Sequence, residues 1–291
     1  MFHSISRSYA LVCHSWNVLK RDKEIMIFPV LSALASLLVA ASFIVPVVMY
    51  QMAHPSSGST AQGGRQGEFE MQTAWYVYTF LFYVVSYFIT IFFNVGVMHC
   101  AAKRMDGGDP TVADGFHGAL SHIGSIFMWS LVSATVGMVL RAISERSGLI
   151  GRIVVSFLGI GWSLLTYFAV PVMIFEGVGA FDAIKRSGTL FKRTWGETVV
   201  GEAGMGLFFG LLAMIGLVPI GLAIFLAMQG TLGIGLGITL GASVLVYWIA
   251  LGVISAALQG VFHVALYRYA STGRISGDYP QERIAAQWRA K

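Results

Sequence analysis

The longest uncharged stretch of the sequence limits what this chain can fold into. Ala203 to Tyr267 contains 65 residues without one Asp, Glu, Lys or Arg. As a single helix it would be about 100 Å long, roughly three times the thickness of a bilayer core. The stretch must therefore fold back on itself, and its only polar break is Gln229-Gly230-Thr231. We expect two membrane-spanning helices around that break.

Composition indicates the same class of protein for the whole chain. Hydrophobic residues make up 56% of the 291 residues and charged residues 11%, against about 25% in soluble domains. The mean hydropathy is +0.72. Lipid can replace the core that a soluble protein of this composition could not build. We predict an all-α integral membrane protein with one polytopic domain, residues 1–291. Its six spans are expected at about 25–50, 75–102, 120–141, 150–175, 199–228 and 235–267.

The most organised polar sequence, Glu176 to Glu197, lies between the fourth and fifth spans. At helical spacing its apolar residues share one stripe: Phe181, Ile184, Gly188, Phe191 and Trp195. Asp182 and four cations share another: Lys185, Arg186, Lys192 and Arg193. A helix with a basic face and an apolar face lies along a membrane surface, with its cations toward the phosphates. We expect an interfacial helix at 179–196, whose four cations and Trp195 face membrane lipids, anionic ones above all, or a protein partner.

A second stretch of this kind opens the chain. Apolar residues spaced by four and three predict another interfacial helix at 3–20, with Trp16 facing the membrane: Ile5, Tyr9, Val12, Trp16 and Leu19. The two stretches align without gaps. Ser8, Leu11, Ser15 and Trp16 match Ser187, Leu190, Thr194 and Trp195. The segment Asp114–Gly124 also precedes a pair of spans. The chain therefore suits three copies of a surface helix followed by a membrane hairpin; the alternative is a chance match between interfacial helices.

The distribution of basic residues predicts the orientation. With six spans, one side of the membrane carries fifteen Lys and Arg residues, on both termini and on two loops. The other side carries four: Arg65, Arg141, Arg146 and Arg152. Cytoplasmic loops are enriched in Lys and Arg. We therefore expect both termini in the cytoplasm, including a polar tail at 270–291.

Two shorter features concern the connections and the course of the helices. Residues 54–72 are rich in Gly, Ser and Gln and predict a flexible polar loop. Pro171 lies near the end of the fourth span and is expected to be accommodated as a kink.

A cluster of carboxylates and histidines follows the second span. His99 and Cys100 precede Asp106, Asp109, Asp114, His117 and His122. Carboxylate and imidazole groups can hold a divalent ion. However, these aspartates flank glycines and a proline, where Asp forms turns and caps helices, and Thr111 with Asp114 resembles a capping box. A capped surface helix is therefore the favoured interpretation, and no metal ion or cofactor is expected.

Polar side chains inside the spans are costly and therefore notable. They are Asn94, Glu202, Gln259 and His263. Gln259 and His263 share one helix face, with Tyr267 a turn further on. One interpretation is a polar path for an ion, a proton or a lipid headgroup; the other, which we favour, is hydrogen bonding between helices.

Glycines recur at helical spacing in the fifth and sixth spans, and the sequence carries no common catalytic motif. Gly206 and Gly210 form GxxxG, and Gly233, Gly237 and Gly241 form GxxxGxxxG. Small residues at this spacing permit tight helix contact, either between the fifth and sixth spans or in a homo-oligomer. We find no Ser-His-acid, HExxH, P-loop or GxSxG pattern. The basic residues are spread over short loops, so no nucleic acid is expected as a partner.

Two phrases of the sequence resemble known families. IFEGVGAFDAIKRSGTLFKRTWGE, with SWNVLKRDKEIMIFPVLS near the start, is similar to an uncharacterised bacterial family of six-span inner-membrane proteins, over nearly the whole chain. The first phrase alone resembles the membrane domain fused to some glycerophosphodiester phosphodiesterases. The resemblance implies a multi-pass protein of the bacterial inner membrane. It supplies no catalytic residue, and the soluble phosphodiesterase barrel is not in this sequence.

These observations favour a non-enzymatic membrane module that engages lipids or a partner through its basic surface helices. The alternative is a transporter or channel, suggested by the repeat and by the polar residues of the spans. An intramembrane hydrolase is the third hypothesis.

Overall fold

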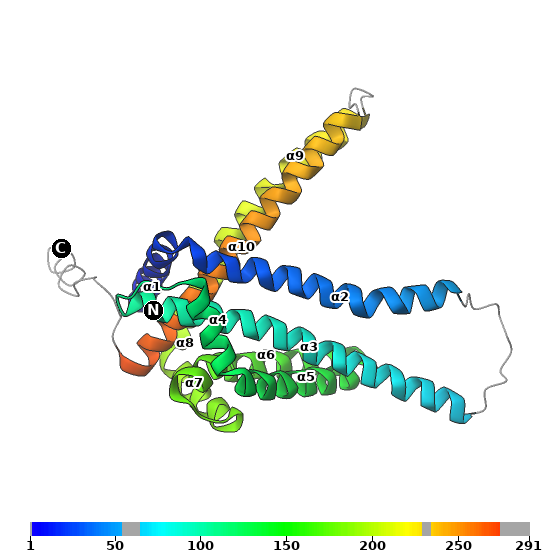
Figure 1. Ribbon diagram of the computed structural model, residues 1–291, viewed down its shortest axis with the longest axis horizontal. Coiled ribbons are helices and arrows are strands. Elements are labelled where there is room, and N and C mark those ends of the chain that lie inside the picture. The colour runs from blue at the N-terminus through cyan, green and yellow to red at the C-terminus, as the bar shows by residue number, and fades with distance from the viewer. Residues whose placement is uncertain (1, 54–64, 229–233, 274–291) are drawn as a thin grey trace. The chain divides into compact units, whose positions relative to one another are not determined.

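The computed structural model describes residues 2–53, 65–228 and 234–273, and the chain is helical along most of these ranges (Figure 1). The helices are α1 (Phe2–Arg21), the 3₁₀ helix η1 (Lys23–Met26), α2 (Ile27–Ala53), α3 (Arg65–Met105), α4 (Val112–Ser121), α5 (Ile123–Arg146), α6 (Leu149–Leu165), α7 (Ala169–Glu176), α8 (Ala180–Ile215), α9 (Leu217–Met228) and α10 (Ile234–Thr272). No strand occurs in the described ranges.

Six helical segments are long and apolar enough to cross a membrane. They are Lys23–Ala53, Ala74–Met105, Ile123–Arg146, Leu149–Glu176, Ala180–Ala223 and Gly237–Thr272. Their outer faces expose large apolar side chains, such as Leu38 on α2 and Val218 on α9, which lipid would cover. The prediction of an all-α membrane protein with six such helices is confirmed.

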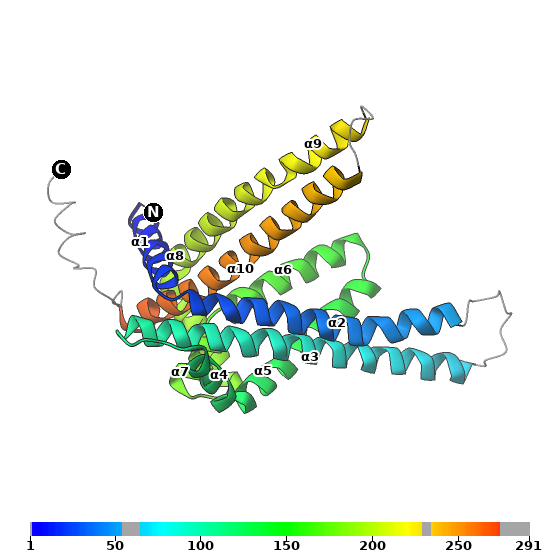
Figure 2. The ribbon, with the colours of Figure 1, turned by 45° about the horizontal axis from the view of Figure 1, so that its top comes forward.

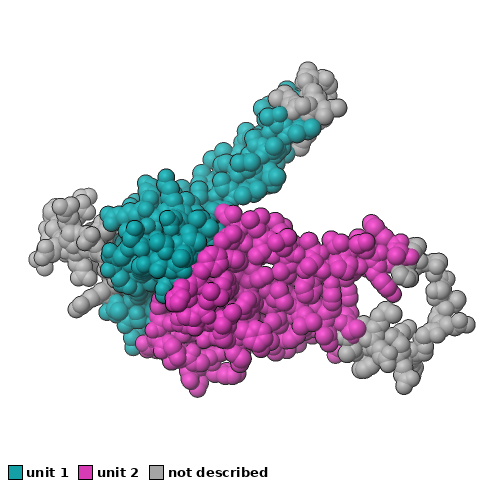
Figure 3. All heavy atoms as spheres, in the orientation of Figure 1, with its two compact units in different colours: residues 1–29, 97–115, 190–291 teal, residues 30–96, 116–189 magenta. Residues whose placement is uncertain are grey.

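The chain forms two compact units, coloured separately in Figure 3. The first unit comprises Met1–Pro29, Val97–Gly115 and Leu190–Lys291. The second comprises Val30–Gly96 and Phe116–Thr189. Since α2, α3, α4 and α8 each continue from one unit into the other, the division does not follow the ends of helices.

In the first unit, α1 packs against α10, and α9 runs beside α10 as a hairpin (Figures 1 and 2). This is the fold-back that the uncharged stretch requires; the polar break at Gln229 lies outside the described residues. Tyr247 on α10 donates to the carbonyl oxygen of Leu212 at 2.6 Å. Trp248 donates to the carbonyl oxygen of Ala213 at 3.3 Å. The two arms of the hairpin are therefore joined near Gly216, where α8 gives way to α9.

In the second unit, α2 and α3 lie side by side (Figures 1 and 2), with the Phe43 and Phe82 rings 5.4 Å apart. The short α5–α6 turn makes a hairpin in which Trp129 and Trp162 stack, with ring centroids 6.4 Å apart. The buried core of this unit joins α3, α4, α5 and α7. Its members are Val95, Ala119, Ile126 and Ile174.

The loop before α3 is shorter than expected, and the fourth span is irregular near its proline. α3 begins at Arg65, so the polar loop expected to reach residue 72 is shorter. Gln66, Glu68, Glu70 and Met71 are good helix formers and allow α3 to extend beyond the apolar sequence. The fourth span is interrupted just before Pro171, where α6 ends at Leu165 and α7 starts at Ala169. This is the turn whose hydrogen bonding a proline disturbs. Pro171 thus occupies the first turn of a helix, where a missing N–H costs nothing.

The glycines that permit close contact are also not those of the GxxxG patterns. A Cβ added at Gly206, Gly210 or Gly241 would meet no atom within 4 Å. A Cβ at Gly201 would lie 2.3 Å from the Phe262 ring. A Cβ at Gly216 would lie 2.4 Å from Trp248. The expected packing of Gly206 and Gly210 between the fifth and sixth spans is therefore wrong, because these two residues lie on the exposed side of α8. Gly233 lies outside the described residues.

Candidate functional site

The start of α8 has the same pattern of buried residues as α1. The matched pairs Ser8 and Ser187, Leu11 and Leu190, and Ser15 and Thr194 are all buried, whereas Trp16 and Trp195 are exposed. The hydroxyl of Ser15 donates to the carbonyl oxygen of Leu11 at 2.8 Å. The hydroxyl of Thr194 donates to the carbonyl oxygen of Leu190 at 3.1 Å. The aligned positions are therefore equivalent in burial, and Ser15 and Thr194 are also equivalent in hydrogen bonding.

A row of small residues fixes the orientation of the α8 start. Ala180, Ala183 and Ser187 are buried on one face of the helix, and the Phe168 backbone N–H donates to the Ser187 hydroxyl at 2.9 Å. Phe181, with 72% exposure, points away from this face. The helix is thus attached to the protein by the face that carries the matched residues Ser187 and Leu190. Phe181, Trp195 and the cations Lys185, Lys192 and Arg193 are exposed.

The four cations of α8 are not equivalent. Arg186 donates to both carboxylate oxygens of Glu176 at 3.2 Å. Lys185 lies 3.7 Å from Asp182, and both side chains are exposed. Lys192 and Arg193 are exposed and make no ion pair within the described part of the chain. They directly precede Thr194, where the backbone leaves helical geometry (φ −123°, ψ 17°), and Trp195, which is 59% exposed.

A similar pair of side chains lies near the end of α1. The Lys20 ammonium lies 5.3 Å from the centre of the Trp16 ring. Trp16 is 38% exposed. At the other end of α1, Arg7 pairs with Glu197 at 2.8 Å. Both tryptophans predicted to face the membrane are therefore exposed, each with a cation close to it in space or in sequence.

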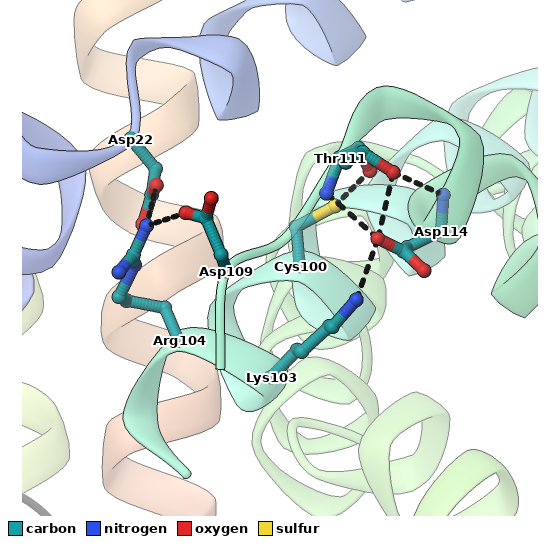
Figure 4. Close-up of polar contacts among 7 residues, drawn as sticks. All are labelled: Asp22, Cys100, Lys103, Arg104, Asp109, Thr111 and Asp114. Atoms are coloured by element: carbon teal, nitrogen blue, oxygen red, sulfur yellow. Dashed lines mark hydrogen bonds and ion pairs between the residues drawn. The ribbon is translucent and has the colours of Figure 1, made fainter. Parts of the chain in front are cut away.

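The carboxylates after α3 form turns and ion pairs (Figure 4). Asp114 accepts from the Thr111 backbone N–H at 2.8 Å, and the Asp114 N–H donates to the Thr111 hydroxyl at 3.3 Å. This is the predicted capping box, and it starts α4. Lys103 lies 2.7 Å from Asp114. The Lys103 ammonium, together with Thr111, holds the pKa of Asp114 well below its ordinary range.

The other two carboxylates of this cluster are held by arginines. Arg104 donates to Asp109 at 2.5 Å and to both carboxylate oxygens of Asp22 (Figure 4). Arg268 donates to the two carboxylate oxygens of Asp106 at 2.5 and 2.8 Å, which lowers the pKa of Asp106. Three aspartates that could have been metal ligands are thus each paired with a cation.

The histidines do not join the aspartates in a common site. His117 is exposed, and His122 Nδ1 lies 2.9 Å from the carbonyl oxygen of Gly118 in its own helix turn. Within the described ranges, no group of three or more His, Cys, Asp or Glu side chains is placed to hold a metal ion. The cluster joins the end of α3 to the segment after α1 and to the end of α10, so its geometry serves to fix these ends.

The four polar residues of the spans have different surroundings. Asn94 and Gln259 are exposed, whereas Glu202 and His263 are partly buried. Gln259 donates to the Ser255 hydroxyl, one turn earlier in its own helix, at 2.9 Å. Asn94 belongs to the second unit and the other three to the first. The favoured interpretation expected hydrogen bonds between helices, whereas this bond of Gln259 lies within α10.

An apolar groove in the first unit was not predicted. It has a volume of about 680 Å³ and lies between α1 and the α8 segment after Thr198, with Leu258 of α10 at its base. Tyr9, Val12 and Trp16 line it from α1. Gly204, Met205 and Phe208 line it from α8. The α1 stripe was visible in the sequence, but only the fold shows that a glycine of α8 faces it across an open space.

Comparison with known proteins adds the family. Neither the curated proteins nor the solved structures include a match to this chain. A family model described as a family of unknown function, DUF6159, matches residues 73–277. This range starts within α3 and ends after α10, and it includes the capped α4, the basic start of α8 and the α8 side of the groove. The chain therefore belongs to the family of unknown function DUF6159.

Proposed function

We propose that this protein is a non-enzymatic module of the bacterial inner membrane that binds anionic lipid headgroups through the start of α8. In this proposal both termini are cytoplasmic, and the exposed cations of α8 lie at the cytoplasmic surface. Lys192 and Arg193 are the main contacts; Trp195 follows them in the sequence, and Lys185 lies two turns earlier on the same helix. Arg186 contributes less because Glu176 already accepts its hydrogen bonds.

The observation that carries the proposal is that Lys192 and Arg193 are exposed, form no ion pair with any residue that the structure describes, and directly precede the exposed Trp195 and the buried-face residue Thr194. A cation near an anionic membrane surface gains about 1 kcal/mol. Two such cations together favour an anionic lipid over a zwitterionic one by about 2 kcal/mol, or roughly 30-fold, at low ionic strength. Trp195 is suited to headgroup depth because its ring is amphipathic.

The test compares two double variants of the full-length protein in native mass spectrometry. Lys192→Gln with Arg193→Gln should lower the number of phosphatidylglycerol molecules retained relative to phosphatidylcholine. Arg146→Gln with Arg152→Gln removes the same charge from two exposed arginines near the α5–α6 turn and should change this ratio less. Equal losses in both variants would contradict a role for α8, because net charge alone would then set the lipid preference.

The orientation has its own test. Thr189 lies in the α8 start and Gly148 in the α5–α6 turn, and both are exposed. In intact cells, a membrane-impermeant maleimide should label Gly148→Cys and leave Thr189→Cys unlabelled until the cells are opened. The reverse pattern would place the basic helix outside and would exclude the proposed site.

The transporter hypothesis predicts a different result. Purified protein in liposomes would then pass an ion or a small solute, and the flux would fall in His263→Ala. Such a flux would overturn the proposal of a non-transporting module. The lining of the groove between α1 and α8 does not include Asn94, Glu202, Gln259 or His263.

A further inference from the structure

We infer that the groove between α1 and α8 is a binding site for one phospholipid molecule, with an acyl chain along the groove and the phosphate near Lys20. This inference deepens the proposed lipid binding and rests on it in placing α1 at headgroup depth. It adds a second, defined site on other residues, because Lys192 and Arg193 do not line the groove.

The groove has the size and shape of a chain-binding site. Its lining on α1 runs from Ser8 to Asn17 and its lining on α8 from Val200 to Phe209. Nine helical steps make each wall about 13 Å long. The volume of about 680 Å³ lies within the range of roughly 300–1,000 Å³ that is usual for small-molecule sites. At its centre a Cβ on Gly204 would meet no atom within 4 Å.

The inner surface of the groove suits a hydrocarbon. Met205, Phe209 and Leu258 line it and are buried. Methionine adapts to irregular apolar partners, and aromatic rings offer large apolar faces. Ser8, a polar residue of the lining, already donates its hydroxyl hydrogen to the carbonyl oxygen of Glu197 at 3.0 Å. An acyl chain would therefore leave this hydroxyl group satisfied.

The groove is continuous with the surface that lipid covers. Phe208 lines it and is 58% exposed, and its neighbours Leu207 and Leu211 are exposed on the same membrane-crossing helix. A phospholipid next to α8 can therefore place a chain in the groove without leaving the bilayer.

One end of the groove offers a charge for the headgroup. Trp16 lines the groove, and the exposed Lys20 ammonium lies 5.3 Å from the centre of its ring. Lysine and tryptophan are both favoured at headgroup depth. At the Ser8 end, Arg7 is already paired with Glu197. The phosphate is therefore assigned to the Lys20 end.

The test uses full-length protein in nanodiscs that contain a phosphatidylcholine with a photoreactive diazirine in one acyl chain. In the wild-type protein, most crosslinks should map to residues 8–17 and 200–209. Gly204→Phe fills the groove from an open position and should reduce these crosslinks at least fivefold. Gly210→Phe is the matched control: it lies on the same helix, is also exposed, does not line the groove, and its Cβ also meets no atom within 4 Å. It should leave the crosslinks unchanged.

Three results would overturn the site. One is an even spread of crosslinks over all exposed spans of the wild-type protein, a measurement that requires no variant to fold. Another is an equal yield in Gly204→Phe and Gly210→Phe. The third is a groove occupied by a second copy of the chain, seen as protein–protein crosslinks at residues 8–17. Because the probe is zwitterionic, Lys192→Gln with Arg193→Gln should keep the groove crosslinks, so failure of one proposal is distinguishable from failure of the other.

Discussion

Arg104 near the end of α3 donates hydrogen bonds to both carboxylate oxygens of Asp22, whose side chain is only 6% exposed. The pair joins the segment after α1 to the end of a membrane-crossing helix within the first unit. A carboxylate this deeply buried needs its partner, because an unpaired charge away from water is costly. The pair is therefore expected to contribute more to stability than the other ion pairs of the polar cluster after α3.

Loss of Arg104 should destabilise the protein more than loss of any other cation in this cluster. We expect Arg104→Ala to lower the free energy of unfolding by about 3–5 kcal/mol, the usual effect of leaving a buried charge unpaired. The double variant Arg104→Ala with Asp22→Ala should be more stable than Arg104→Ala alone. Unfolding in mixed micelles measures the free energy of unfolding of both variants. A double variant as unstable as the sum of the two single ones would show that the residues act independently.

The pair between Asp106 and Arg268 should contribute much less. The Asp106 side chain is 63% exposed, so solvent screens the interaction and a double-mutant cycle should give about 1 kcal/mol or less. Arg268 lowers the folded-state pKa of Asp106. The contribution is therefore present above the unfolded pKa, near pH 4, and is lost as the pH falls through the folded value. A double-mutant cycle that gives the same coupling energy at high and at low salt would contradict solvent screening of this pair.

The capping box predicts a local effect at the start of α4. Thr111→Ala removes the hydroxyl that accepts from the Asp114 N–H and should cost about 1 kcal/mol. Hydrogen exchange of the first α4 amides should become faster. Thr135→Ala is the control, because the Thr135 hydroxyl bonds only within its own helix, to Leu131. Unchanged exchange in Thr111→Ala would show that Lys103 alone holds Asp114 in place.

Two glycines of α8 should respond differently to the same substitution. Gly201→Ala places a Cβ 2.3 Å from the Phe262 ring, and the required shift of α10 against α8 should cost about 1–3 kcal/mol. Gly206→Ala meets open space and should leave the melting temperature in detergent within a few degrees of wild type. Equal melting temperatures would mean that Phe262 can move away without cost.

His14 should make stability depend on pH. Burial, with Arg21 nearby, lowers the pKa of His14 below 6.5, and the buried Nε2 atom has no hydrogen-bond partner in the described structure. As the pH falls below 6.5 the unfolded chain takes up this proton more readily than the folded one, so stability decreases until the folded pKa is reached. His14→Leu should reduce the loss of melting temperature between pH 7.5 and pH 5. An identical loss in both proteins would exclude His14 as the source.

The sequence determined the class of fold because membrane insertion depends on local, additive properties. The 65 uncharged residues up to Tyr267 needed no tertiary information to require a hairpin. The capping box at Thr111 was likewise readable, since its partners are three residues apart. The match between Ser8 and Ser187 predicted equivalent helices, and their shared burial pattern agrees with it.

Only the tertiary structure decided which side chains meet across the chain. Asp106, Asp109 and Asp114 are close in sequence, but their partners include Arg268, and the remote Asp22 shares Arg104 with Asp109. GxxxG spacing could not show that Gly206 lies on an open face, whereas Gly201, outside the pattern, contacts Phe262. A helix brings together residues three or four apart, but the rotation of a helix about its axis is fixed by the helices packed against it. The groove between α1 and α8 exists for that reason, and no local pattern predicts it.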